Sequence, residues 1–198
     1  MRVVVSRYNE DVEWTKHFDD VLIYNKGEPL PGFSNVQVLE NVGREGHTYY
    51  KHICDHYETL DDYTVFLQGY PFDHTREIIA RVDALDPTVD FEFLCDTIIN
   101  CNLTGCRYSP DLSMIPTYQQ LFDEEKTSLH FEFGKGAQFV VSKRRILQRP
   151  KEFYQRIVDM LGKDVNPIEG HIIERFHGLV FSSNYTSSEK DTSLEERP

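Results

Sequence analysis

The sequence lacks any long apolar run and is poor in positive charge. No stretch holds about 18 consecutive apolar residues, so we expect no membrane span. Only 21 Lys and Arg residues stand against 33 Asp and Glu residues, which gives a net charge of −12. This deficit argues against nucleic acid as a partner, because DNA and RNA are bound by basic surfaces. An anionic ligand such as a nucleoside diphosphate would need local Arg or Lys side chains, or a metal ion.

Cysteine is scarce as well, with 4 residues in the chain. The beginning, MRVVVSRYNED, lacks the apolar length and the small-residue cleavage site of a signal peptide, so we expect a cytoplasmic protein with free thiols. Cys101 and Cys106 have no second pair at zinc-binding spacing, which makes a zinc site a weak alternative. The absence of G-x-x-x-x-G-K-[ST] excludes a P-loop, and the absence of G-x-G-x-x-G and G-x-S-x-G disfavours a Rossmann dinucleotide site and a serine hydrolase.

Short β-branched runs alternate with amphipathic segments in the first half of the chain. This alternation predicts an α/β domain whose central sheet is mostly parallel and covered by helices. We expect strands at 2–6, 21–24, 36–39 and 63–67, and helices at 13–20 and 43–57. Later we expect helices at 78–85, 149–161 and 172–181, strands at 91–94 and 137–141, and an irregular, partly mobile region at 109–125. A single domain would span 1–181, followed by a disordered polar tail at 182–198.

Polar residues follow each of the first four expected strands. Because ligands of open α/β sheets bind beyond the carboxyl ends of the strands, these residues predict a site at one edge of the sheet. They are Tyr8, Asn9, Glu10 and Asp11, then Asn25 and Lys26, then 41–47, and finally Gln68 to His74.

Three segments have residue types that suit such a site. In 41–50, glycines and the free N–H groups of a helix start favour an anion, and Arg44 suits phosphate; an ordinary strand–helix turn with a solvated Arg44 is equally open. Asp73 and His74 suit Mn²⁺ or Mg²⁺, although such a pair is more often a surface turn. His171 lies on one helix face with Glu174 and Arg175, where a structural ion pair is the alternative.

These blocks resemble GT-A glycosyltransferases, which have an apolar strand ending in Tyr-Asn-Glu, a Gly-containing third turn and a D-Y-x-V-F-L strand before the metal motif. The corresponding stretches are VVVSRYNED, ENVGREGHTYY and DDYTVFLQGYPFDH. More closely, the chain resembles a little-characterised GT-A-like family of fungi and large DNA viruses, which would place it in the host cytoplasm if it is viral. The shared blocks are SRYNED, GREGHTYY, VFLQGYPFDH, GAQFVVSKRRILQRPKEFY and the ending ERFH, and they span about Val3 to Phe181.

The resemblance implies transfer of a sugar from a nucleotide-diphosphate sugar, with UDP favoured, to a glycan or protein-linked acceptor with Mn²⁺ or Mg²⁺. It implies a metal motif at Asp73 and His74, although the usual Asp-x-Asp is absent and His171 or His177 would complete the coordination. It implies an acceptor side at Gln138, His171 and Arg175. The donor side would be formed by Tyr8, Asn9, Glu10, Asn25, Lys26, Arg44 and Gln68.

An inverting transferase also needs a carboxylate base for the acceptor hydroxyl. The candidates are Asp96, Glu132 and Glu174, and Glu132 is favoured because it precedes the GAQF block on the implied acceptor side. Two alternatives remain open. The chain is a non-catalytic relative that binds a nucleotide or glycan, or it is a metal-dependent hydrolase of nucleotide sugars.

Overall fold

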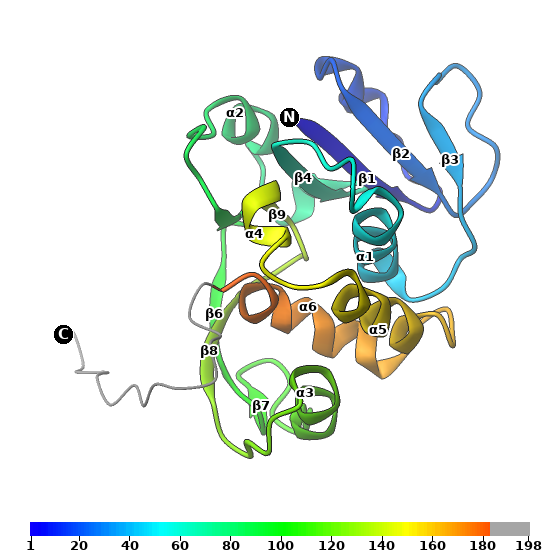
Figure 1. Cartoon of the computed structure of the whole chain (residues 1–198). Helices are drawn as coiled ribbons and strands as arrows, with labels where there is room; N and C mark the ends of the chain where they lie inside the picture. Colours follow the sequence, from blue (N-terminus) through cyan, green and yellow to red (C-terminus); the bar gives the residue numbers. More distant parts are fainter. Residues whose placement is uncertain (183–198) are drawn as a thin grey trace.

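A mixed sheet of 6 strands forms the centre of the protein, in the order β3-β2-β1-β4-β9-β5 (Figure 1). The computed structural model describes residues 1–182, so the tail expected at 182–198 lies outside the described residues except for Ser182. The strands of this sheet are β1 (Arg2–Arg7), β2 (Val21–Asn25), β3 (Val36–Val38), β4 (Tyr63–Gln68), β5 (Phe91–Phe93) and β9 (Phe139–Ser142).

The first part of the sheet is parallel, as the alternation of elements predicts. β1 pairs in parallel with β2 and β4, and β2 pairs in parallel with β3. β9 is antiparallel to both β4 and β5, so the sheet as a whole is mixed. The reason is that the chain enters β9 at Phe139, opposite Phe66 near the carboxyl end of β4, and runs back to Ser142 opposite Tyr63.

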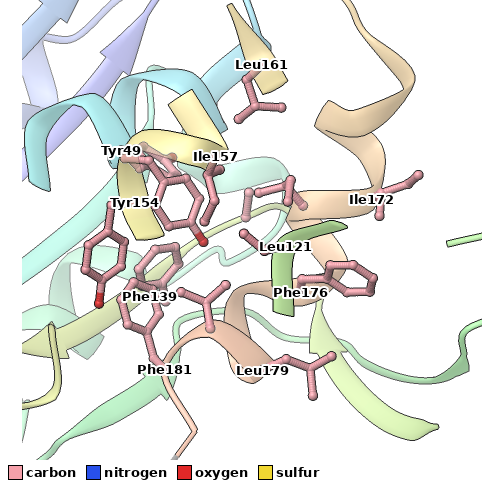
Figure 2. Packing of buried hydrophobic residues seen from close by; sticks show 14 of the residues in the cluster. Tyr49, Leu121, Phe139, Tyr154, Ile157, Leu161, Ile172, Phe176, Leu179 and Phe181 are labelled. Carbon is pink, nitrogen blue, oxygen red and sulfur yellow. The ribbon is translucent and has the colours of Figure 1, made fainter. Parts of the chain in front are cut away.

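One face of the sheet is covered by α1 (Arg44–His56), α5 (Lys151–Leu161) and α6 (Ile168–Val180) (Figure 1). Their apolar residues recur at three- and four-residue spacing, so each helix packs one apolar face against the sheet. Figure 2 shows Tyr49, Tyr154, Phe139 and Phe181 meeting in this layer, and all of these side chains are fully buried or nearly so. Burial of an aromatic side chain of this size contributes about 2–3 kcal/mol, which makes this layer the main core.

A thinner layer covers the other face. It consists of a 3₁₀ turn, η1 (Glu13–His17), and the short helix α2 (Ile78–Asp83). Successive residues of β1 divide between the layers: Val4 belongs to the helical core, whereas Val3 and Val5 pack in the second cluster. This division is the expected consequence of the two-residue period of a strand.

Three expectations about single elements need correction, and one sheet was not foreseen. The region 109–125 is not irregular throughout, because it contains α3 (Ile115–Phe122), whose Tyr118 and Leu121 are buried in the main core. The helix expected at 13–20 is a 3₁₀ turn that ends at His17. The last helix begins at Ile168, directly after Pro167, and not at residue 172. A second sheet of 3 strands was not foreseen, because its two longer strands alternate exposed with buried residues and have no continuous apolar run. Its strands are β6 (Ile98–Asn102), β7 (Gly105–Cys106) and β8 (His130–Gly134).

The remaining elements are η2 (Pro71–Asp73), which follows β4, and α4 (Lys143–Ile146), which follows β9. Within residues 1–182, none of the helices is both long and apolar enough to cross a bilayer. This agrees with the lack of a long apolar run in the sequence.

Candidate functional site

A cleft of about 590 Å³ opens at the edge of the sheet where β1, β2 and β4 end. Strand ends on this edge were expected to converge, and the cleft shows that they do. Its walls also include the beginning of α1 and the loop between α5 and α6. The lining residues are Ser6, Arg7, Tyr8, Glu10, Lys26, Asn41, Arg44, Glu45, Gln68, Tyr70, Asp73, Val165 and Asn166.

Two tyrosines stand at the mouth of the cleft. Tyr8 follows β1 and Tyr70 follows β4, and the register that pairs Ser6 with Gln68 brings the two neighbouring strand ends to the same level. Their side chains are among the exposed large apolar groups, with 51% of Tyr8 and 48% of Tyr70 accessible. Exposed aromatic rings at a cleft provide flat surfaces on which a base or a sugar ring can pack.

The cations nearest the strand ends are occupied by the protein itself. Arg7 donates to the carbonyl oxygens of Glu10, Tyr8 and Glu28, and to the side chain of Asn25. Lys26 donates from Nζ to the carbonyl oxygens of Val42 and Arg44, and burial lowers its pKa to about 8. Both residues therefore hold loops in place and have little capacity left for an anionic ligand.

The beginning of α1 has an unusual backbone. Gly43 and Arg44 both have positive φ, at 61° and 54°, a conformation that a non-glycine residue such as Arg44 rarely adopts. The N–H groups of Gly43 and Arg44 donate to the carbonyl oxygens of Asp164 and Val165 in the α5–α6 loop. These bonds, together with Lys26, hold the strained turn. They also mean that the N–H groups of Gly43 and Arg44 are used internally and do not face an anion.

The Arg44 side chain is the basic group that the cleft presents to a ligand. It runs along Gly170 of α6, where a Cβ atom would come within 3.0 Å of its Cδ. Its Nη1 donates to Nε2 of His171 at 3.3 Å and to Asn166 at 3.4 Å. Burial, then the charges of Arg44 and Arg175, lowers the pKa of His171, so this imidazole is neutral and accepts the bond. Arg44 is thus aimed by α6 and retains other N–H groups for a ligand.

Two carboxylates, Glu45 and Glu174, interact electrostatically with each other, and Glu45 pairs with Arg44 at 3.7 Å. Each side chain is 13% exposed. Burial raises the pKa of Glu45; the Arg44 charge opposes this rise and the Glu174 charge adds to it. Glu174 accepts the N–H of Gly136 at 3.0 Å. A carboxyl group whose pKa is raised in a cleft is the kind of group that exchanges protons with a substrate.

Of the two expected metal ligands, only Asp73 lines the cleft. It is exposed at the end of η2. His74 packs its ring against Gly136, where a Cβ atom would come within 2.3 Å of the ring. Among residues 1–182, no group of three or more His, Cys, Asp or Glu side chains is arranged to hold a metal ion.

Four other sequence candidates serve the fold. Asn25 bonds Arg7 and Glu28 within the turn after β2, and Asn9 accepts the N–H of Glu28. Gln138 is fully buried and donates to Thr75 and Leu94. Arg175 is buried on α6, where it donates to the carbonyl oxygen of His171 and to Ser109.

The other two carboxylate candidates are exposed and, in the part of the chain that is described, neither lines the cleft. Asp96 accepts the N–H of Arg76 at 3.4 Å. Glu132 lies on β8 opposite Asn100, in the second sheet. Glu174 does not line the cleft either, but its charge acts on Glu45, which does.

A second hollow of about 600 Å³ lies at the opposite edge, where β4 begins and β9 ends. Its most exposed cation, Arg144, is held by Asp90 at 2.8 Å, and Asp90 also binds Arg145 and Ser142. Its position at the amino ends of the parallel strands is opposite to the one that α/β proteins use for ligands. We therefore place the candidate site in the first cleft.

Comparison with known proteins gives one match. The family model described as protein of unknown function, DUF3431, matches residues 3–89 and 95–194. The chain belongs to this DUF3431 family. No curated protein and no solved structure matches it. The DUF3431 match covers all the elements that build the cleft, so the arrangement at the carboxyl edge is a property to test across that family.

Ser6, Arg7, Val165 and Asn166 were not predicted as site residues, and Glu45 was expected only as part of the polar segment 41–47 and not as a candidate base. Glu45 has a signal in the sequence, because it is the first carboxylate in the helix that begins with Arg44. Val165 and Asn166 have none, since they come to the cleft only through the contact of the α5–α6 loop with Gly43 and Arg44.

Proposed function

We propose that this protein is a glycosyltransferase that binds a nucleotide-diphosphate sugar, with UDP favoured, in the cleft at the carboxyl edge. The observation that carries the proposal is convergence: the ends of β1, β2 and β4 and the beginning of α1 supply aromatic, basic and acidic side chains to a single cleft. The volume of about 590 Å³ is in the range of about 300–1,000 Å³ in which proteins bind small molecules.

Each wall of the cleft has chemistry suited to a part of such a donor. The rings of Tyr8 and Tyr70 would pack against the base or the sugar, and Gln68 would donate to or accept from their polar groups. Arg44 would bind the diphosphate, because its planar guanidinium matches phosphate oxygens. Its attachment to His171 and Asn166 fixes the direction from which it approaches.

A divalent metal is part of the proposal because the cleft also contains Glu10 and Asp73. Two carboxylates would repel a diphosphate unless a cation lay between them. Mg²⁺ and Mn²⁺ in such sites are commonly held by one or two carboxylates plus the phosphates and water, so a preformed cluster of three ligands is not required. When bound, the metal would stabilise the charge of the leaving diphosphate.

Glu45 is the carboxylate best placed to take the acceptor's proton, with Glu174 acting on it from outside the cleft lining. Glu45 lines the cleft, its pKa is raised by burial, and the negative charge of Glu174 adds to that rise. An ionised Glu45 beside the negative Glu174 would be a stronger proton acceptor than an isolated carboxylate, because its pKa is higher. Glu132 stays a candidate only if the acceptor binds along β8.

The test is donor turnover. UDP- and GDP-sugars would be incubated with Mn²⁺ and a mixture of glycan acceptors, and release of the nucleoside diphosphate would be measured. We expect release that depends on acceptor and falls at least a hundredfold in Glu45→Gln, the range for loss of a general base. Glu132→Gln, a matched change of an exposed carboxylate, should keep full turnover.

Other outcomes of the same assay would identify one of the two alternative functions. Release that does not depend on acceptor would identify a nucleotide-sugar hydrolase. Donor binding without any release would identify a non-catalytic binding protein. Loss of turnover in Glu132→Gln but not in Glu45→Gln would contradict the assignment of the base.

A further inference from the structure

Cys101 and Cys106 form a pair that the cleft does not use. They lie opposite each other in the hairpin of β6 and β7, whose register also pairs Asn102 with Gly105. Both side chains are buried, and all 4 cysteines are free thiols. The hairpin turn between them is short, so the local backbone geometry sets the two cysteines opposite each other.

The backbone bonds of Cys106 show which kind of cross-strand pair this is. Its N–H and carbonyl groups both bond to Ser109, on the side away from β6. Cys101 and Cys106 are therefore a non-hydrogen-bonded pair, the kind in which facing side chains come closest, with Cα atoms about 4.5 Å apart. Disulfides span Cα separations of about 4.4–6.8 Å, so a bond between these sulfurs needs little backbone movement.

The two thiols are also chemically unequal. Arg175 of α6, through its charge and its N–H groups, and the neighbouring Cys101 thiol both lower the pKa of Cys106. Burial alone would raise the pKa of Cys106, but these donors outweigh it and lower that pKa, whereas burial and the bond to Cys106 raise the pKa of Cys101 to about 12. Thiolate is the reactive form of cysteine, so Cys106 is the nucleophile of the pair.

We propose that Cys101 and Cys106 are a thiol–disulfide site, in which Cys106 reacts first with a peroxide and Cys101 then closes the disulfide. The Cys106 thiolate attacks one peroxide oxygen, the O–O bond breaks, and the products are a sulfenic acid and hydroxide. The Cys101 sulfur displaces the sulfenic hydroxyl group, forms the S–S bond and releases its proton with that hydroxyl as water. The two thiols lose two electrons and the peroxide gains them. This inference is independent of the function proposed for the cleft.

The test treats the whole protein with hydrogen peroxide at low molar excess and follows each thiol by differential alkylation and fragment-ion sequencing. We expect Cys101 and Cys106 to disappear together, with a mass loss of two hydrogen atoms that is restored by a dithiol. Cys54 and Cys95 should stay reduced, because burial raises the pKa of each. Oxidation of Cys54 or Cys95 before the pair would overturn the proposal.

Single variants separate the two roles. In Cys101→Ser, a sulfenic acid should accumulate at Cys106 and be trapped by dimedone; in Cys106→Ser, Cys101 should remain unlabelled. Arg175→Met should slow oxidation about tenfold and move its pH profile to higher pH, and Arg175→Lys should restore part of the rate. If trapping occurs at Cys101, or if Arg175→Met leaves rate and pH profile unchanged, the assignment of Cys106 as an Arg175-activated nucleophile is wrong. Should Arg175→Met not fold, the Cys variants and Arg175→Lys still decide the matter.

Discussion

At the scale of single residues, the cleft depends on which cations are committed to the fold. Arg7, Lys26 and Arg44 all line the cleft. However, the N–H groups of Arg7 and Lys26 donate hydrogen bonds to backbone carbonyl groups and, for Arg7, to Asn25. Local sequence correctly placed Lys26 at a strand end on the ligand side of the sheet. It could not show that Lys26 is a structural residue, because its partners, Val42 and Arg44, are supplied by a different turn.

The buried Lys26 gives the first prediction. Its pKa falls from 10.5 in a model peptide to about 8 because burial penalises the charged form. Between these values the unfolded chain binds more protons than the folded one, so the contribution of Lys26 to stability is least below pH 8 and grows as pH rises toward 10. We expect the unfolding free energy of the native protein, minus that of Lys26→Met, to increase by up to about 1.4 kcal/mol per pH unit above pH 8. Urea titrations at several pH values measure this; a difference that does not change with pH would refute it.

At the scale of elements, the beginning of α1 is the segment that contacts the α5–α6 loop and also lines the cleft. Gly43 has φ of 61°, and a Cβ atom there would come within 2.6 Å of the Leu161 carbonyl oxygen. Gly32 also has positive φ, at 85°, but nothing lies within 4 Å of its Cβ position. An alanine at position 32 would therefore suffer backbone strain alone, whereas an alanine at position 43 would suffer both backbone strain and a steric collision.

We predict that Gly43→Ala lowers the unfolding free energy by about 2–4 kcal/mol, since strain and collision both act. Gly32→Ala should cost only about 1 kcal/mol, because strain acts alone. Thermal and chemical denaturation of both variants gives the comparison. Equal costs would mean that the α5 contact does not constrain this turn.

The elements also show where prediction from sequence stops. Strands with clear β-branched runs, such as β1 and β4, and the helix α1 with its spaced tyrosines, were found because their pattern is local. The strands β6 and β8 alternate between exposed and buried residues and include Asn, His and Glu, so they lack the continuous apolar run by which β1 and β4 were recognised. The approach of Glu174 to Glu45 depends on α6 packing against α1, a contact between residues more than a hundred positions apart that no local pattern encodes.

At the scale of the whole molecule, three buried histidines make the protein sensitive to acid. Burial lowers the pKa of His47 to about 4 and those of His52 and His177 to about 3. Above pH 6.5 these imidazoles are neutral in both states. Below that value the unfolded chain takes up protons that the folded protein does not, so stability falls as pH falls.

The predicted loss is about 1.4 kcal/mol per pH unit for each histidine below pH 6.5. His177→Phe should remove about a third of that slope, although it also costs stability at neutral pH by leaving the Tyr50 hydroxyl without its 2.8 Å bond. Phe181→Leu, a change in the same core layer without a titrating group, should lower stability at all pH values and keep the slope. An unchanged slope in His177→Phe would contradict this account.

The charge of the whole molecule bears on the central claim, because a protein of net charge −12 holds an anionic donor only through local cations and a metal. The most direct measurement is a calorimetric titration of UDP, with and without Mn²⁺, into the native protein, Arg44→Met and Arg144→Met. Both changes remove a guanidinium and keep an apolar stem, one in the cleft and one in the hollow at the opposite edge.

We predict Mn²⁺-dependent binding that weakens about tenfold or more in Arg44→Met, as expected for loss of a charge-assisted hydrogen bond of about 1.5–3 kcal/mol, and that is unchanged in Arg144→Met. Absence of binding to the native protein, or equal weakening in the two variants, would contradict the claim that the cleft at the carboxyl edge is a nucleotide-sugar site.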